Sequence, residues 1–278
     1  MQFAFGKFDF YSSKEPPEET REFCHVEKRQ VSGRNVFTLS SRVQKSSRHI
    51  LYLHGGAYVQ TFVKQHWKFL AMLVKETHCT ITAPDYPLAP EFTFLDAYSM
   101  VVPLYKEIIV HAGAENTILM GDSSGGGFAL GLAQKMKANE NVVPYKIILL
   151  SPWLDVTLDN PEIPKSDQTD PFLSAKALRK AGLVFAGSSD PRNPMLSPIN
   201  GSLEGLRGIS LFIGSCDLLA VDARSLRNQA LEQDVPINYR EYQEMGHVWM
   251  LLNFRESKQA KREIIDIIND RPNSTKSI

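Results

Sequence analysis

The chain has 278 residues, of which 43 % are hydrophobic and 22 % are charged, and its 31 basic side chains balance 31 acidic ones. This composition is typical of a globular protein with a sizeable core, and a net charge of zero excludes the basic surface of a nucleic-acid-binding protein. No run reaches the roughly 18 apolar residues of a membrane span, and the N-terminus lacks the apolar core of a signal peptide. We therefore expect neither a nucleic-acid partner nor stable membrane insertion.

The cysteines indicate a reducing environment. There are three of them, Cys24, Cys79 and Cys216, and none belongs to a CxxC pair. An odd number at such spacing favours free thiols over a disulfide framework or a zinc site. We expect a cytoplasmic location, with no metal site and no cofactor.

In chain order, residues 1–22 are first aromatic and then charged and rich in proline, which favours a loose N-terminal arm. Two alternating runs at 24–31 and 34–39 flank Ser32-Gly33, and this pattern predicts a β-hairpin. The apolar run 49–53 fits a buried parallel strand.

Strands and helices then alternate to the end of the chain. Further strands are predicted at 80–83, 117–120, 146–150, 209–213 and 237–242, and helices at 66–77, 95–112, 127–139, 174–187, 220–233 and 255–269. Alternation of this kind predicts an α/β fold with a mostly parallel sheet that is covered by helices on both faces. The segment 156–200 is too long for a simple connection, and the tail after Pro272 is expected to be disordered.

Four unusual loops each follow a predicted strand, at 54–58, 121–125, 214–219 and 244–248. The carboxyl ends of parallel strands meet at one edge of a sheet, where α/β proteins place their sites. We therefore expect these loops to lie together and to form the functional site.

The loop Gly121-Asp122-Ser123-Ser124-Gly125 has the G-x-S-x-G pattern of a nucleophile elbow, a sharp turn from a strand into a helix. The glycines are needed because a Cβ two positions from the serine would clash in so tight a turn. The alternatives are an ordinary Gly/Ser-rich loop or a phosphate cradle. A phosphate loop would carry a lysine followed by Ser or Thr, which is missing here.

The loop His54-Gly55-Gly56-Ala57-Tyr58 ends a strand in consecutive glycines, whose amides can point at a ligand. The amides of Gly55 and Gly56, together with that of Ser124, would make an oxyanion hole, although an ordinary turn is the alternative. We expect the His54 side chain to fix this loop by hydrogen bonding. The carboxylates Asp85 and Glu91 lie in a proline-rich loop. We expect them to fix that loop, and solvated surface charges are the alternative.

Taken together, the motifs resemble the hormone-sensitive-lipase-like branch of the α/β-hydrolase esterases. The resemblance covers roughly residues 35–270 and rests on these stretches: His54-Gly55-Gly56, Asp85–Glu91, Gly121–Gly126, Ser151-Pro152-Trp153, Asp217 and His247. It implies an α/β-hydrolase fold in which Ser123 is the nucleophile, His247 the base and Asp217 the triad acid. It also assigns the oxyanion hole to the amides of Gly55, Gly56 and Ser124.

Three positions depart from the family pattern. Ala57 replaces a third glycine, Pro87 replaces an arginine, and Asp217 is followed by Leu-Leu instead of Asp-Pro-Leu. The last departure makes Asp222 a rival for the role of the acid. We favour Asp217, because Asp222 falls in the first turn of a predicted helix, where a carboxylate is favourable for another reason.

The resemblance implies a serine esterase that hydrolyses short- to medium-chain carboxylic esters of small molecules. An amide- or peptide-cleaving hydrolase with the same triad, or a non-catalytic binding protein on this fold, are the alternatives. Four aromatic residues are expected either to line the substrate pocket or to pack in the core: Tyr58, Trp153, Phe172 and Trp249.

We expect residues 1–278 to form a single domain, to which 1–22 and about 156–200 contribute a small cap. A surface insertion without a role is the alternative for the second segment. Whether the chain is a monomer or a homodimer is left open.

Overall fold

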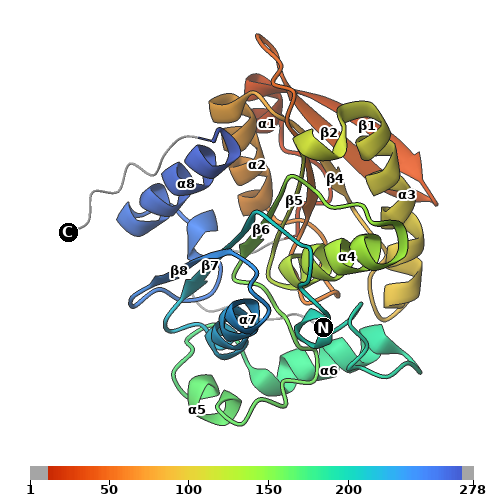
Figure 1. Cartoon of the computed structure of the whole chain (residues 1–278). Coiled ribbons are helices and arrows are strands. Elements are labelled where there is room, and N and C mark those ends of the chain that lie inside the picture. The colour runs from red at the N-terminus through yellow and green to blue at the C-terminus, as the bar shows by residue number, and fades with distance from the viewer. Residues whose placement is uncertain (1–11, 271–278) are drawn as a thin grey trace.

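The computed structural model describes residues 12–270, which form an eight-stranded sheet with helices on both faces (Figure 1). The strand order is β1-β2-β4-β3-β5-β6-β7-β8, in which β1, β2 and β4 pair antiparallel and all other neighbours pair parallel. The strands are β1 Cys24–Val31, β2 Arg34–Ser41, β3 His49–Leu53, β4 Thr80–Pro84, β5 Thr117–Asp122, β6 Lys146–Leu150, β7 Ile209–Gly214 and β8 Ile237–Tyr242.

The helices agree closely with the sequence pattern. They are α1 Glu18–Phe23, α2 Lys64–Thr77, α3 Phe94–Ala112, α4 Ser124–Glu140, α5 Ile163–Asp167, α6 Ala175–Ala186, α7 Ala220–Glu232 and α8 Arg255–Ile268, with short 3₁₀ turns at Ala114–Asn116, Pro198–Asn200 and Trp249–Leu251. The predicted hairpin and the mostly parallel sheet are confirmed.

Four local predictions need correction or go untested. Part of the N-terminal arm is the helix α1, which packs on α2, and the segment 156–200 contains α5 in addition to the expected α6. Helix α4 begins at Ser124, immediately after the serine of the elbow. Residues 1–11 and 271–278, which include the predicted disordered tail after Pro272, lie outside the described residues.

Apolar side chains from the two faces of the sheet build two cores. In β3, Leu51 and Leu53 face the core under α3, α4 and α7, whereas Ile50 and Tyr52 face the core under α2 and α8. This alternation is the period of two that a strand buried on both faces requires. The sheet is therefore held from both sides, and its loops extend from a rigid frame.

The register of β3 against β5 places two of the suspected loops side by side. These strands run parallel from the pair His49 and Thr117 to the pair Leu53 and Gly121. The loop that follows Leu53 therefore begins next to the turn that contains Ser123. Strands β7 and β8 end together in the same way, at Gly214 and Tyr242.

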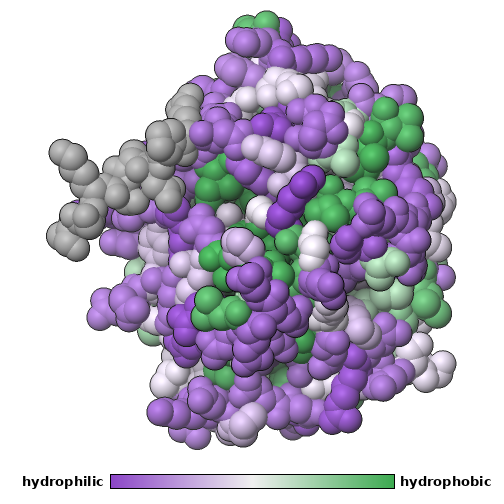
Figure 2. All heavy atoms as spheres, viewed as in Figure 1, coloured by the Kyte–Doolittle hydropathy of each residue, from purple (hydrophilic) through white to green (hydrophobic). Residues whose placement is uncertain are grey.

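The surface carries no single large apolar area in the view of Figure 2, where hydrophilic residues predominate between separate hydrophobic patches. The exposed large hydrophobic side chains among the described residues are scattered: Phe23, Val43, Leu95, Val110, Leu183, Val184 and Leu231. Within residues 12–270, no helix has both the length and the apolar character needed to cross a bilayer. All three cysteines are unpaired, as the sequence predicts.

Candidate active site

Ser123 lies at the apex of a tight turn between β5 and α4. Its backbone has φ of 51° and ψ of −123°, in a region that residues with side chains rarely adopt. A Cβ on Gly125 would lie 2.0 Å from the carbonyl oxygen of Leu53, and one on Gly121 would lie 2.2 Å from the carbonyl oxygen of Gly125. The expected requirement for glycine at both positions is confirmed, and the turn is a nucleophile elbow.

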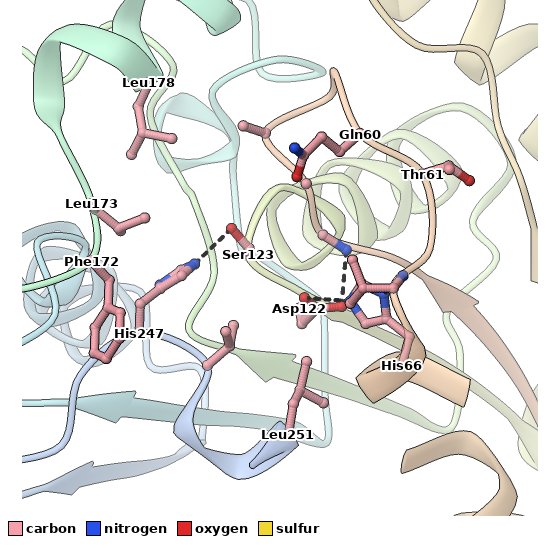
Figure 3. A pocket seen from close by; sticks show the side chains of 15 residues that line it. Gln60, Thr61, His66, Asp122, Ser123, Phe172, Leu173, Leu178, His247 and Leu251 are labelled. Carbon is pink, nitrogen blue, oxygen red and sulfur yellow. Dashed lines mark hydrogen bonds and ion pairs between the residues drawn. The ribbon is translucent and has the colours of Figure 1, made fainter. Parts of the chain in front are cut away.

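A continuous chain of hydrogen bonds joins the serine to an imidazole and a carboxylate, and Figure 3 shows its first bond, between Ser123 and His247. His247 Nε2 lies 2.9 Å from Ser123 Oγ, and His247 Nδ1 lies 2.9 Å from Asp217 Oδ2. Asp217 follows β7 and is fully buried, and His247 follows β8. The loops thus bring together the three side chains that the sequence singles out.

The rival carboxylate lies elsewhere. Asp222 sits in the first turn of α7 and accepts a hydrogen bond from Asn160 Nδ2 at 3.1 Å, and within residues 12–270 it makes no contact with His247. Burial, together with the nearby charge of Asp155, raises the pKa of Asp222 to about 7. The geometry therefore favours Asp217 as the partner of the imidazole.

The environment of His247 makes it a stronger base than a free imidazole. Burial by itself would lower the pKa of His247, but the charge and hydrogen bond of Asp217, together with the charges of Asp170 and Asp122, outweigh that effect. The net result is a pKa above the ordinary value of 6.5. An imidazole of this kind is suited to accept the serine proton near neutral pH.

The structure corrects the predicted oxyanion hole at Gly55. The Gly55 amide donates its hydrogen to Asp122 Oδ1 at 2.9 Å, so it is not available to a ligand. Within the described chain the amides of Gly56 and Ala57 donate no hydrogen bond, and both residues line the pocket beside Ser123. The free donors near the serine are therefore Gly56, Ala57 and Ser124, whose amide opens helix α4.

Ala57 occupies the position of the third glycine in the family pattern. Its φ is 53° and that of the following Tyr58 is 61°, so two successive residues are left-handed. Alanine therefore keeps the glycine-type turn at a cost in backbone strain.

Side chains around this loop hold it in place, as expected for His54 and Asp85. His54 Nδ1 lies 2.7 Å from the Gly55 carbonyl oxygen, and its ring stacks on Tyr86 at 4.3 Å. Asp85 Oδ1 accepts a hydrogen bond from the Thr61 hydroxyl at 2.6 Å. Glu91 is exposed and makes no contact of this kind in the described chain, so the prediction for it is wrong.

Asp122 is a pocket residue that sequence reasoning missed, although it lies within the elbow motif. Its buried carboxylate accepts hydrogen bonds from the Tyr52 hydroxyl at 2.6 Å, the Gly55 amide at 2.9 Å and His66 Nε2 at 3.2 Å. Burial alone would raise the pKa of Asp122, but His66 and these hydrogen bonds hold it below its ordinary value. Since the Val63 amide donates to His66 Nδ1, that ring carries its proton on Nε2.

The pocket in front of Ser123 is narrow and mostly apolar (Figure 3). Its volume is about 70 Å³, and its apolar lining consists of Val63, Phe172, Leu173, Leu178, Val248 and Leu251. Phe172 thus follows the first of its two predicted alternatives, pocket lining and core packing. Leu173 and Leu178, from the start of the predicted helix region, carried no sequence signal that separates a pocket residue from a core residue.

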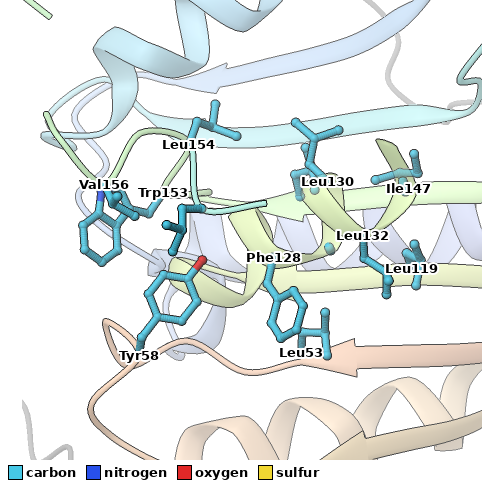
Figure 4. Packing of buried hydrophobic residues seen from close by; sticks show 14 of the residues in the cluster. Leu53, Tyr58, Leu119, Phe128, Leu130, Leu132, Ile147, Trp153, Leu154 and Val156 are labelled. Carbon is cyan, nitrogen blue, oxygen red and sulfur yellow. The ribbon is translucent and has the colours of Figure 1, made fainter. Parts of the chain in front are cut away.

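Of the two alternatives for Tyr58 and Trp153, pocket lining and core packing, the structure shows core packing (Figure 4). Tyr58 is 1 % exposed and Trp153 is fully buried, and neither lines the pocket. The Tyr58 ring stacks on Phe185 at 4.2 Å. Trp249 is likewise buried and outside the lining.

Asp170 joins the segment 156–200 to the loop that carries Asp217. Its Oδ2 accepts a hydrogen bond from the Leu218 amide at 2.6 Å, and its Oδ1 accepts hydrogen bonds from the amides of Phe172 and Leu173. One carboxylate therefore fixes two residues that line the pocket and the residue that follows Asp217.

Comparison with known proteins agrees with this geometry. A family model described as the alpha/beta hydrolase fold matches residues 50–251. An esterase of Acinetobacter venetianus is 30 % identical over 241 residues, which are 85 % of this chain and 78 % of that protein. An acetyl-hydrolase of Streptomyces hygroscopicus is 29 % identical over 207 residues, which are 74 % of this chain and 69 % of that protein.

The fold of the chain is also similar to those of solved esterase and lipase structures. A hormone-sensitive lipase from a metagenome library has a TM-score of 0.84 at 27 % identity, covering 90 % of this chain and 85 % of that one. An esterase from the bacterial hormone-sensitive lipase family has a TM-score of 0.83 at 25 % identity over the same shares. The chain therefore belongs to the α/β-hydrolase fold family, in its hormone-sensitive-lipase-like branch of esterases.

Proposed function

We propose that the protein is a serine esterase in which Ser123 is the nucleophile, His247 the general base and Asp217 the residue that orients His247. The observation that carries this proposal is the chain of two 2.9 Å hydrogen bonds that ends at the floor of a pocket. The pattern matches the requirement for an activated nucleophile, in which a base contacts the hydroxyl and a third group orients the base.

The reaction proceeds in two steps. His247 Nε2 accepts the Ser123 proton while Oγ attacks the ester carbonyl, and the amides of Gly56, Ala57 and Ser124 stabilise the resulting oxyanion. Protonated His247 then gives its proton to the leaving alcohol, which breaks the C–O bond and forms the acyl-enzyme. Water, deprotonated by the same imidazole, releases the acid and restores Ser123.

The size of the pocket supports short acyl groups. A cavity of about 150 Å³ accommodates one benzene molecule, and the pocket here has about 70 Å³. We infer that acetyl to butyryl groups fit, at the short end of the range expected from the sequence. The similarity to an acetyl-hydrolase is consistent with this size.

The segment 156–200 acts as a cap in this proposal, because Phe172, Leu173 and Leu178 come from it and line the pocket. The described part of the N-terminal arm contacts the stretch between the pocket residues Thr61 and Val63, since the Ser13 amide donates to the Phe62 carbonyl oxygen at 2.6 Å. The unpaired cysteines support a reducing, cytoplasmic location.

Acyl-chain selectivity tests the pocket directly. With 4-nitrophenyl esters, we expect kcat/KM to fall about tenfold or more between butanoate and decanoate, because a longer chain overfills the cavity. Leu178→Ala enlarges the pocket and shifts the preference toward octanoate. Leu183→Ala, on the exposed side of the same helix, is the matched control.

In the same assay Ser123→Ala should lower turnover by about 10⁶. A preference of the wild type for anilides over esters would favour the amidase alternative, and turnover that survives in Ser123→Ala would reject the proposed nucleophile.

The pH dependence tests the pair His247 and Asp217. Activity requires neutral His247, so kcat/KM falls as the pH drops through its pKa, which is raised above 6.5. We expect the acid midpoint of the profile to lie above pH 6.5. Asp217→Asn removes the charge that raises this pKa, so the midpoint moves to lower pH while kcat falls about 10⁴-fold. An unchanged midpoint in this variant would contradict the assignment.

The Asp122 carboxylate is expected to support kcat by holding the loop 54–58, which carries the proposed oxyanion donors Gly56 and Ala57. In Asp122→Asn, the side-chain NH2 group replaces one carboxylate oxygen and must face either His66 Nε2–H or the Gly55 amide. Both of these groups are hydrogen-bond donors, so one hydrogen bond is lost. The contact that holds Gly55 weakens and the loop 54–58 shifts. We expect kcat to fall about 10- to 100-fold, below the full loss of an oxyanion donor, with little change in KM. Asp222→Asn, a buried carboxylate away from the serine, is the control. Equal losses in both variants would indicate a general loss of stability.

A further inference from the structure

Gln60 follows the turn at Gly56-Ala57-Tyr58 and is hydrogen-bonded to it through the backbone. Its amide donates to the Gly56 carbonyl oxygen at 2.9 Å, and its side chain lines the pocket that contains Ser123. In Figure 3 its carboxamide points into the cavity, on the opposite side of Ser123 from Phe172. The side chain is half-buried, and within residues 12–270 its carboxamide has no hydrogen-bond partner.

The other polar side chains of the lining are already engaged. The Thr61 hydroxyl donates to Asp85 at 2.6 Å, and His66 and Asp122 bond to each other. Among the lining residues outside the triad, Gln60 therefore offers the free side-chain donor and the free side-chain acceptor. A free carboxamide in an apolar pocket costs desolvation when substrate enters, unless the substrate supplies a partner.

Gln60 also lies at the border of a second cavity. This groove has a volume of about 580 Å³ and runs between Gln60, the loop at Ala89-Pro90 and helix α6. Its lining is mostly apolar, and Gln60 is the residue that the two cavities share. A substrate whose short acyl group fills the small pocket can extend past Gln60 into this larger groove.

We propose that Gln60 is a specificity-determining residue, which selects esters whose larger, alcohol part carries a hydroxyl or amide group close to the ester. The inference rests on the proposed esterase function and adds the substrate class. A carboxamide both donates and accepts, so it matches a hydroxyl or an amide, which do the same. The apolar groove then holds the rest of the alcohol part.

The test compares esters of equal size that differ by one hydroxyl: cyclohexyl acetate and the cis and trans monoacetates of cyclohexane-1,2-diol. Release of acetic acid is followed by titration. We expect the wild type to favour one of the monoacetates by about three- to tenfold in kcat/KM, the effect of one neutral hydrogen bond. Gln60→Leu keeps the shape of the side chain and should bring that ratio close to one. Gln60→Glu, which only accepts, should keep part of the preference.

Thr61→Val is the matched control. It removes a hydroxyl group from the same pocket, but this hydroxyl already has Asp85 as its hydrogen-bond partner. Its preference ratio should equal that of the wild type. The proposal is overturned if the wild type does not favour a monoacetate, or if Gln60→Leu and Thr61→Val change the ratio equally. Either result, with 4-nitrophenyl acetate still hydrolysed through Ser123, would leave the proposed function standing. Absence of hydrolysis of every ester would instead reject the function itself.

Discussion

The candidate site depends on one backbone constraint, the left-handed turn at Ser123 between β5 and α4. The turn keeps its shape because Gly125 packs directly on the carbonyl oxygen of Leu53, where β3 ends. Pairing of β3 with β5 therefore fixes the serine hydroxyl, the first amide of α4 and the start of the oxyanion loop relative to one another. Apolar cores on both faces of the sheet hold these strands, so the strain at Ser123 is sustained by the packing of the whole domain.

Two buried carboxylates then join loops that are distant in the sequence. Asp122, at the end of β5, connects this strand to Gly55 and, through His66, to the first turn of α2. Asp170 connects the segment 156–200 to the residue after Asp217. Neither side chain contacts the serine hydroxyl in the structure. Both place backbone groups whose positions set the shape of the pocket, which explains how loops from four strands form one site.

The sequence predicted the parts of the fold and site that depend on local pattern. Strand and helix periods gave the sheet, and glycine spacing gave the elbow at Ser123. The errors came from contacts between distant residues. The amide of Gly55 could not be assigned without the side chain of Asp122, which lies 67 positions away. The direction of the Tyr58 ring depends on left-handed backbone angles at 57–58, where alanine and tyrosine carry no signal of such a turn. For the acid, the sequence favoured Asp217 over Asp222, and the contact between Asp217 and His247 agrees with that preference.

The central claim is that the hydroxyl of Ser123, the imidazole of His247 and the free amides form one reaction centre. The most direct measurement is a crystal structure of the protein after reaction with an ethyl-bearing fluorophosphonate, whose adduct mimics the tetrahedral intermediate. We expect phosphorus bound to Ser123 Oγ, with the phosphoryl oxygen about 3 Å from the amide nitrogens of Gly56, Ala57 and Ser124. An unmodified Ser123, or a phosphoryl oxygen that faces away from these amides, would contradict it.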